Sequence, residues 1–276
     1  MRCMLLVKSN ETIETTGLAN ERDLTEMGRF NDELTRAGVV LSSEGLLPSA
    51  RGARVRIRGG EFTVTKGPFA EPASLVAGFW MVRTKSKDDA RRWLERVPPA
   101  AGEVELRPLY EPEDFPVDAA EQEGGWRDQE IAARDAFEAK PPARLAGTKR
   151  FILMLKADTA TESGRLPTED VLSKMGALME QGVQDGSLLG GDGLKPSSAA
   201  VKVKTADGRR TLVDGPFAET KELVAGYTLL QLRSLDDAIA FAKRWLDIHV
   251  LVGVTEAEIE IRELMELQDM PVTTGS

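Results

Sequence analysis

The phrase VTKGPFAEPASLVAGF at residues 64–79 returns as LVDGPFAETKELVAGY at residues 212–227. In the longer windows 63–90 and 211–238 no gap is needed, and 14 of 28 residues are identical. Unrelated sequences of average composition would share about two. Such a repeat indicates that one structural module has been copied within the chain.

The two copies extend beyond this phrase and differ by one insertion. The offset of 148 between the copies also relates Lys8 to Lys156. Near the end of each copy, VELRPL at 104–109 pairs with IEIREL at 259–264, an offset of 155. The second copy therefore carries seven extra residues, which we place in or beside WLDIHVLVGVTEAE.

The composition limits the class of protein. The chain has 276 residues, 41% of them hydrophobic and 29% charged, which is typical of soluble globular proteins. Its formal charge of −9, with dispersed Lys and Arg, argues against nucleic-acid binding, which needs a concentrated basic surface. No apolar run approaches the ~20 residues that cross a membrane, and the run after Arg2 is too short for a signal peptide. The single cysteine, Cys3, excludes an internal disulfide, and we expect a cytoplasmic protein.

Each copy contains the same order of periodic segments. An apolar strand, CMLLV or FILML, precedes an amphipathic helix whose apolar face in the first copy includes Leu24, Met27 and Phe30. The alternating runs ARVRI and AVKVK then begin hairpins whose return strands end at the GPF phrase. An apolar strand, a helix beginning at SKDDA or SLDDA, and a final alternating strand complete the copy.

This order is β-α-β-β-β-α-β, and it predicts a ferredoxin-like α+β module with one extra hairpin strand. The helices cover one face of the sheet, and the other apolar face needs a partner because exposing it costs ~25 cal/mol per Å2. The second copy supplies that partner. We therefore expect two ferredoxin-like modules forming an intramolecular dimeric α/β barrel, with further homodimerisation left open.

We expect three parts in the chain: a first module at 1–115, a linker at 116–148 and a second module at 149–276. The linker is acidic and turn-rich at EPEDFPVDAAEQEGG, and RDQEIAARDAFEA has the pattern of one polar helix. It is either a tether with a surface helix or a regulatory lid over a pocket.

DGPFAETKE followed by VAGY, the upstream GDGLKPSS or SEGLLPSA, and the helix start SLDDA resemble the YCII-related family, often called DGPF-domain proteins. The resemblance covers nearly all of both modules and leaves the linker aside. It implies a dimeric α/β barrel that binds small molecules. The family includes at least one dehydrochlorinase of a hydroxylated aromatic, and other members are encoded beside sigma factors and described as transcription-related.

The first copy departs from the family phrase. Lys66 stands in place of Asp214, and Ala73 in place of Lys221. Some YCII-related proteins are thought to use a His–Asp pair, but the one histidine of this chain, His249, lies in the insertion. A His–Asp mechanism therefore does not transfer to this chain on the resemblance alone.

The inventory of side chains limits the possible chemistry. One histidine and one cysteine cannot build a His/Cys metal cluster. A carboxylate site for a hard cation would have to draw on Asp185, Asp192 and Asp214. We expect no metal and no organic cofactor, and we expect Cys3 and His249 to have packing roles.

Asp214 has two explanations at this stage. Its carboxylate caps the Gly-Pro turn, or it contacts a ligand, since the first copy keeps the turn without the acid. We expect Asp214 and Lys221 to be the catalytic residues, acting by acid–base chemistry, with an ordinary surface ion network as the alternative. The expected ligand contacts, taken from a strand end, the GGDGLKP loop, the hairpin and the GPF phrase, are Lys156, Asp192, Lys202, Phe217 and Glu219.

The sequence thus predicts an uncharacterised YCII-related protein that binds a small molecule, either as a binding protein or as a cofactor-independent enzyme using carboxylate and lysine side chains. The alternative from another class is a non-catalytic regulatory or interaction protein, for example one linked to sigma-factor transcription. A purely structural duplicated module is a third reading. No substrate can be named from the residues.

Overall fold

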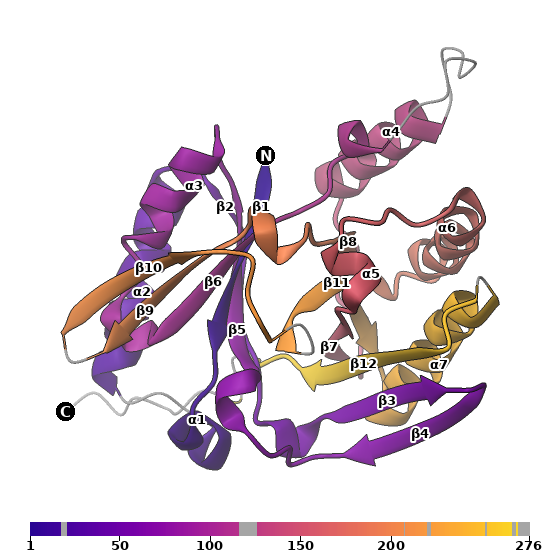
Figure 1. Ribbon diagram of the computed structural model, residues 1–276, viewed down its shortest axis with the longest axis horizontal. Helices are drawn as coiled ribbons and strands as arrows, with labels where there is room; N and C mark the ends of the chain where they lie inside the picture. Colours follow the sequence, from indigo (N-terminus) through magenta and orange to yellow (C-terminus); the bar gives the residue numbers. More distant parts are fainter. Residues whose placement is uncertain are drawn as a thin grey trace.

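The computed structural model describes residues 1–17, 21–115, 126–206, 208–219, 222–251, 253–266 and 269. These residues form two antiparallel six-stranded sheets flanked by helices (Figure 1). The first sheet has the strand order β10-β9-β6-β1-β5-β2, and the second has the order β4-β3-β12-β7-β11-β8.

The elements of the first copy and their bounds are β1 (Arg2–Lys8), α1 (Glu11–Thr16), α2 (Glu21–Arg36), β2 (Val40–Gly45), β3 (Ala53–Arg58), β4 (Glu61–Lys66), β5 (Val76–Arg83), α3 (Lys87–Leu94) and β6 (Glu103–Pro108). Helix α4 (Trp126–Ala139) lies between the copies. The elements of the second copy are β7 (Lys149–Lys156), α5 (Thr159–Glu162), α6 (Glu169–Gln184), β8 (Leu188–Gly193), β9 (Val201–Ala206), β10 (Arg209–Asp214), β11 (Val224–Leu232), α7 (Leu235–Leu251) and β12 (Glu256–Glu263).

Each copy contributes a ferredoxin-like group of four strands to its own sheet. In the first copy their order is β6-β1-β5-β2, and in the second it is β12-β7-β11-β8. This is the strand order of a split βαβ pair, with two helices on one face. The copies are therefore two ferredoxin-like modules of a mixed α+β fold.

In each copy, a hairpin lies between the second and third of these strands in chain order: β3–β4 between β2 and β5, and β9–β10 between β8 and β11. This hairpin leaves the sheet of its own copy and joins the other sheet. Hairpin β3–β4 of the first copy pairs with β12 of the second, where Val55 lies opposite Ile259. Hairpin β9–β10 of the second copy pairs with β6 of the first, where Val203 lies opposite Val104. We call this reciprocal pairing the hairpin exchange.

Side-chain burial fixes the position of the exchanged hairpins. The inward residues of β3 and β9, which alternate with charged ones, are at most 1% exposed. Burying one Val or Ile side chain is worth ~1.5–3 kcal/mol. Each hairpin therefore contributes several kcal/mol only when it lies on the other copy. The residues are Ala53, Val55, Ile57, Val201 and Val203.

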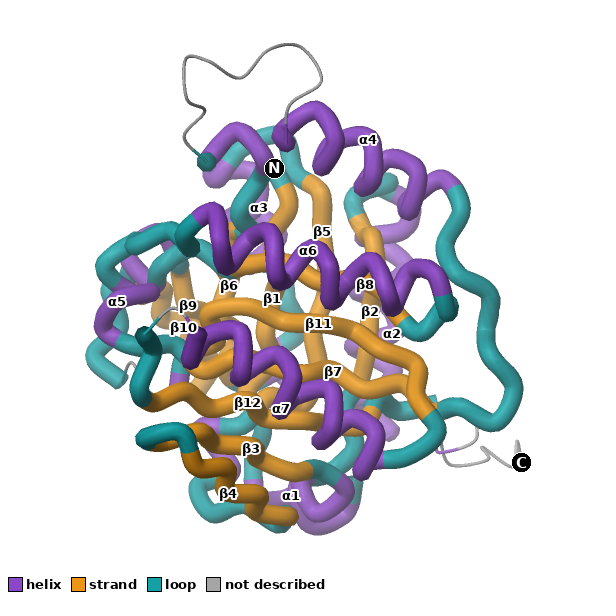
Figure 2. The backbone as a smooth tube through the Cα atoms, turned by 90° about the vertical axis from the view of Figure 1, so that its right-hand side faces the viewer, coloured by secondary structure: helices purple, strands orange, loops and turns teal. Residues whose placement is uncertain are grey.

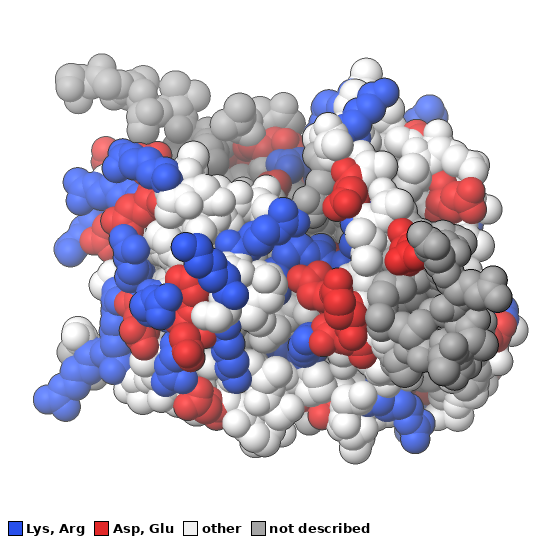
Figure 3. All heavy atoms as spheres, turned by 90° about the horizontal axis from the view of Figure 1, so that it is seen from above, with Lys and Arg blue, Asp and Glu red and all other residues white. Residues whose placement is uncertain are grey.

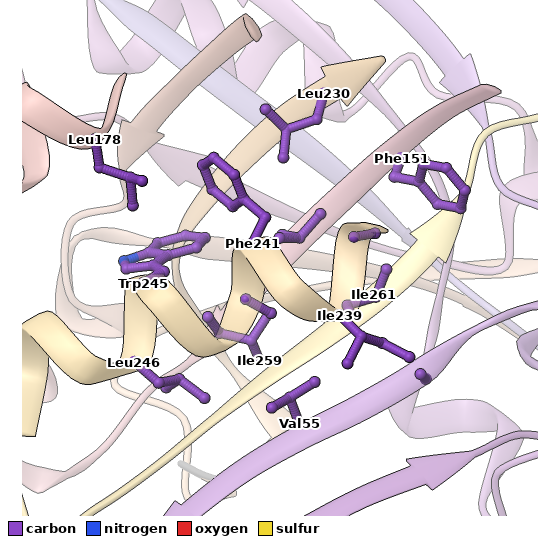
Figure 4. Packing of buried hydrophobic residues seen from close by; sticks show 14 of the residues in the cluster. Val55, Phe151, Leu178, Leu230, Ile239, Phe241, Trp245, Leu246, Ile259 and Ile261 are labelled. Carbon is purple, nitrogen blue, oxygen red and sulfur yellow. The ribbon is translucent and has the colours of Figure 1, made fainter. Parts of the chain in front are cut away.

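Three hydrophobic layers result from this arrangement. One lies between the first sheet and helices α2 and α3, and another between the second sheet and helices α6 and α7. Figure 4 shows the latter, with Phe241 and Trp245 of α7 on the side of Leu230 and Leu178, and Leu246 on the side of Ile259 of β12. A third cluster draws on both copies and lies between the sheets. Figure 2 shows α6 and α7 over the second sheet, whose strands run across those of the first.

The strand order predicted from the sequence was wrong by one strand per copy. Strands β2 and β8 were missed, and Asp192 was assigned to a loop although it lies on β8. The segments VLSSEG and LLGGDG are rich in Ser and Gly, which weaken the strand signal. They form strands because β5 and β11 offer them free edges. Helix α1 was also missed.

The insertion predicted near WLDIHVLVGVTEAE lengthens one helix. Helix α7 has 17 residues, whereas its counterpart α3 has 8. The predicted polar linker helix corresponds to α4.

Two isolated β-bridges, rather than continuous ladders, connect the two sheets. Leu46 pairs with Leu264, and Leu109 with Leu194. Among the described strands, β2 and β10 are the edges of the first sheet, and β4 and β8 those of the second. The sheets therefore face each other without closing into a hydrogen-bonded barrel. In the described ranges, no helix is both long and apolar enough to span a bilayer.

The hairpin exchange predicts how the chain behaves when it is cut. We expect fragments 1–115 and 149–276, produced together, to purify as a 1:1 complex, because each supplies the edge hairpin that completes the other's sheet. Size-exclusion chromatography with light scattering measures the stoichiometry. Two folded fragments that elute separately as monomers would contradict the exchange.

Candidate functional site

Charged side chains lie between the two sheets, beside the apolar cluster that both copies share. Along β1 and β7, every second residue faces the opposite sheet, and both series end in a lysine: Met4, Leu6 and Lys8, and Ile152, Met154 and Lys156. The side chains of Lys8 and Lys156 are only 7% and 9% exposed. Each lysine faces a buried Glu-x-Arg pair on the neighbouring strand. Those pairs are Glu105 and Arg107 on β6, and Glu260 and Arg262 on β12.

The first group of charges, which we call the Glu105 cluster, combines both copies. Arg107 Nη1 donates to Glu105 Oε1 at 3.0 Å, and both side chains are essentially unexposed. Arg107 Nη2 also reaches Glu162 of α5 at 3.4 Å. Lys8 and Lys202 lie 4.0 and 3.9 Å from Glu105 Oε2. The exchanged hairpin thus brings Lys202 of the second copy beside Glu105 of the first.

The second group, the Glu260 cluster, is the counterpart of the first. Arg262 reaches Glu260 at 3.5 Å and Glu14 of α1 at 3.2 Å. Lys156 Nζ lies 3.2 Å from Glu260 Oε2, and Arg54 Nη2 donates to the same oxygen at 2.9 Å. Arg54 comes from the exchanged hairpin of the first copy. Each cluster is therefore incomplete without the other module.

In each cluster, burial and neighbouring charges shift the pKa of one buried group, Glu260 in one cluster and Lys8 in the other. Burial opposes ionisation of Glu260, but Lys156, Arg262 and Arg54 together lower its pKa from the usual 4.5 to about 2. The ionised form stabilises the fold above pH 4.5, and that contribution is lost as the pH falls from 4.5 towards 2. In the Glu105 cluster, burial lowers the pKa of Lys8, the nearby charges of Lys202 and Lys156 lower it further, and Glu105 opposes the shift.

The GPF phrase forms the wall of each cluster. Both Gly-Pro bonds are cis, and a Cβ on Gly67 or Gly215 would lie 1.9 or 1.7 Å from the carbonyl oxygen of Ser49 or Ser197. Only glycine fits there. The phenylalanine of the phrase places its ring against the hairpin cation of the cluster, at 4.2 Å in both copies. The pairs are Arg54 over Phe69 and Lys202 over Phe217.

A serine links this turn to the glutamate that a short helix contributes to each cluster, Glu162 of α5 or Glu14 of α1. Ser197 Oγ accepts from the amide of Phe217 at 3.1 Å and donates to Glu162. Ser49 accepts from the amide of Phe69 at 3.1 Å, and its own amide donates to Glu14 at 2.7 Å. The repeated phrase therefore positions a phenyl ring and an acid around the charged layer in both copies.

Of the predicted ligand contacts, Lys156, Lys202 and Phe217 lie in or against these clusters, whereas Glu219 is exposed. Asp192 lies elsewhere, in a separate cluster. Arg2 donates to it at 3.1 and 3.0 Å, and Tyr227 Oη donates at 3.0 Å.

The Asp192 cluster joins the two copies and the linker. Burial alone would lower the pKa of Arg2, but Asp192 and Glu111 raise it above its ordinary value. Burial raises the pKa of Asp192, and the charges of Arg2 and Arg134 oppose that shift. Arg134 of α4 lies 3.2 Å from Asp192. With this many donors, the carboxylate of Asp192 acts as an anchor for the linker helix. The equivalent cluster in the other half consists of Arg150, Glu44 and Glu266, and Arg144 of the linker joins it.

Asp214 lies at the end of the exchanged hairpin, on the outside of the molecule. Its side chain is 65% exposed and accepts from Arg91 Nη1 of α3 at 2.7 Å. Lys66, at the equivalent position, lies 3.4 Å from Asp236 of α7. Asp214 thus faces a cation on α3, and Lys66 faces an anion on α7. Lys221 lies outside the described residues, and a catalytic role for Asp214 and Lys221 stays a prediction.

The remaining candidates are placed as follows. Burial raises the pKa of Cys3 to about 11, which favours the inert thiol. His249 Nδ1 lies 3.1 Å from the carbonyl oxygen of Trp245 in α7, and burial lowers its pKa. Asp185 accepts from the amide of Ser187 at 2.8 Å. In the part of the chain that the structure describes, no three His, Cys, Asp or Glu side chains gather as metal ligands.

Sequence reasoning missed the central acids and arginines of both clusters. A signal was present, because the charged residues of VELRPL and IEIREL alternate with buried apolar ones at equivalent places in the two copies. Charged residues are almost never fully buried unless they are paired. The missed residues are Glu105, Arg107, Glu260 and Arg262.

The close contact at the GPF turn predicts that an added methyl group destabilises the protein at Gly215 but not at Gly176 of helix α6. Gly215→Ala should lower the free energy of unfolding by more than about 3 kcal/mol, because its Cβ would collide with the Ser197 carbonyl group. Gly176→Ala, in helix α6 with no atom near its Cβ position, should raise stability by about 0.5–1 kcal/mol. Urea unfolding of both variants measures the difference. Equal effects would contradict the close contact at Gly215.

The surface pairs at the hairpin ends predict a charge-swap effect. Asp214→Lys should lower stability slightly, by at most about 1 kcal/mol, because it places a cation against Arg91 on the surface. Arg91→Glu should restore stability in the double variant. The coupling is measured from the melting temperatures of all four proteins. Additive effects would show that Asp214 and Arg91 do not pair in solution.

Comparisons with known proteins agree with the internal repeat. The family model of the YCII-related domain matches the chain twice, at residues 1–113 and 150–256. An uncharacterised protein of Rhizobium meliloti (strain 1021) is 37% identical over 75 residues, which is 27% of this chain and 60% of that protein. The chain thus spans less than two thirds of that relative. The two matches of the family model, one in each module, show that the chain belongs to the YCII-related domain family.

Proposed function

We propose that the chain is a small-molecule-binding protein whose ligand lies in the charged layer between the sheets, with the two facing sheets as its barrel-like wall. The observation that supports this most is the burial of the Glu105 and Glu260 clusters between the sheets. Three residues expected from the sequence to contact a ligand lie in or against these clusters: Lys156 in the Glu260 cluster, and Lys202 and Phe217 in the Glu105 cluster.

The cost of burying charge favours a functional layer over a structural one. Replacing buried ion pairs by apolar residues is often neutral or stabilising. A module pair that needed only to hold its sheets together would do so with the apolar cluster already present between them. Six cations are instead drawn into this layer. They are Lys8, Arg54, Arg107, Lys156, Lys202 and Arg262.

The same groups support acid–base chemistry as the extension of this proposal. Burial lowers the pKa of Lys8 beside Glu105, and a lysine with a lowered pKa gives up its proton more readily than an exposed one. Asp214 is exposed and salt-bridged. A role for Asp214 would therefore require the hairpin end to move towards the ligand. We propose the lysine–carboxylate pairs of the layer as the first place to look for catalysis.

The surface features favour a ligand over a protein partner. Eight large apolar side chains are exposed among the described residues, and each lies on a different element or loop. On the face shown in Figure 3, acidic and basic side chains are interspersed rather than gathered into one patch. A regulatory or interaction role would need a contiguous docking surface. The eight residues are Met1, Leu24, Leu41, Val64, Leu145, Val183, Val213 and Leu251.

The test is a screen for ligands followed by mapping. Small acids, amines and neutral compounds are screened by thermal shift on the full chain, and each hit is mapped by amide chemical shifts. We expect hits among acids, with the largest shifts on β1, β6, β7, β9 and β12. Shifts confined to the outer groove of about 190 Å3 between α6 and α7, or no hits at all, would contradict the proposal.

A further inference from the structure

Helices α6 and α7 lie side by side on the second sheet (Figure 2), and a groove of about 190 Å3 lies between them on the outer surface. Its apolar lining comes from Leu178 of α6, Phe241 of α7 and Leu232 at the end of β11. Leu178 and Phe241 are only 5% and 9% exposed. Sites for drug-sized ligands measure ~300–1,000 Å3, so this groove suits a single ring with a short chain.

The first copy has larger side chains at the equivalent place. At the offset of 148, Leu178 corresponds to Phe30, and Phe241 to Trp93. The rings of Phe30 and Trp93 lie 6.4 Å apart in the core between the first sheet and its helices. The second copy has a phenyl ring where the first has an indole, and an isobutyl group where the first has a phenyl ring. The groove lies where this volume is missing.

A contact between helices shows that the two places are equivalent in space. Nη2 of Arg96, just after α3, lies 2.7 Å from Glu33 of α2. Arg244 and Gln181, the residues 148 positions later, form the same contact between α7 and α6, with Nη2 donating to Oε1. Arg96 also lies over the ring of Trp93, at 4.5 Å from its centre. The first copy therefore holds aromatic rings and a cation together where the second copy has the groove.

The acids that line the groove lack the cation that the first copy provides. Asp89, in the first turn of α3, pairs with Arg92 at 3.0 Å. Asp237 is the equivalent acid of α7, but Ala240 stands where the first copy has Arg92. Asp185, at the end of α6, adds a second carboxylate where the first copy has an alanine. Within the described ranges, neither Asp185 nor Asp237 forms an ion pair.

We propose that this groove binds a small aromatic amine, as a ligand site separate from the charged layer. The ring lies against Leu178 and Phe241, and the ammonium group lies at Asp237, where the first copy has the guanidinium of Arg92. Burial of the ring supplies most of the affinity. The exposed carboxylates add a modest preference for a cation, because the guanidinium of Arg244, which also lines the groove, is bonded to Gln181.

The probe is phenethylamine, titrated into the full chain and followed by amide chemical shifts. We expect the largest shifts at residues 178–187 and 232–244, and for a ligand this small a dissociation constant of about 1 mM. Phenethyl alcohol, the neutral compound of the same shape, should bind roughly fivefold more weakly, and added salt should reduce this difference. Ethylamine, which lacks the ring, should not saturate the groove below about 20 mM.

The variants separate the ring from the charge. Phe241→Trp should weaken both aromatic compounds at least about fivefold, because the larger indole takes up the groove. Asp185→Asn combined with Asp237→Asn should remove the preference for the amine and leave the affinity for the alcohol within about twofold. Asp89→Asn, the matched change in the first copy, should leave both affinities within about twofold.

Thermal melts verify that each variant is folded. Asp185 and Asp237 are exposed, and asparagine keeps an oxygen that can accept from the amide of Ser187 as Asp185 does. The double variant therefore tests the site even if Phe241→Trp does not fold.

Three results would overturn the groove as an amine site. They are equal affinities of the unmodified chain for the amine and the alcohol, affinities that the folded variants leave unchanged, and largest shifts outside 178–187 and 232–244. The charged layer is tested separately, because its expected ligands are acids. Hits confined to amines in the groove would support this site and contradict the proposed function, whereas hits confined to acids in the layer would do the reverse.

Discussion

The structure depends on the pairing of β9 with β6 and of β3 with β12. Through these two ladders, each copy places a hairpin on the edge of the other copy's sheet and buries its inward Val and Ile residues there. The same ladders carry Lys202 and Arg54 to the buried acids of the opposite copy. The charged layer therefore exists only while the two copies remain paired, and one polypeptide guarantees that pairing.

Duplication lets the halves diverge within this constraint. The GPF turn, the serine and the acid on the short helix are kept in both copies, because they build the wall of each cluster. The hairpin cation is Arg54 in one half, where it donates to Glu260, and Lys202 in the other, where it lies 3.4 Å from Glu103. At the hairpin end, Lys66 and Asp214 differ because they meet helices of opposite local charge. These surface ion pairs explain why the first copy has a lysine where the second has an aspartate, without invoking a catalytic role.

The sequence predicted the repeat, the ferredoxin-like order of the helices and most strands, and the position of the insertion. It did not predict β2 and β8, because Gly and Ser gave them no strand signal and only the neighbouring strand supports them. It also could not assign the hairpins. The alternating pattern of ARVRI fits the edge beside β6 as well as the edge beside β12, and the choice depends on packing between modules.

The sequence pointed to some members of the charged clusters. Lys156, Lys202 and Phe217 flank recognisable elements and lie in or against the clusters, whereas Asp214, to which the motif drew attention, lies on the outside. Glu105 and Glu260 were overlooked because a charged residue in an alternating strand normally faces water. Their burial follows from the meeting of two sheets, which no local pattern records.

The most direct test of this account is the measurement of nuclear Overhauser effects between backbone protons across the exchanged ladders. The account predicts cross-peaks between Val104 and Val203, and between Ile259 and Val55, the residue pairs that lie opposite each other. Cross-peaks that instead join Val55 to Val104, and Val203 to Ile259, would place each hairpin on its own module and contradict the exchange.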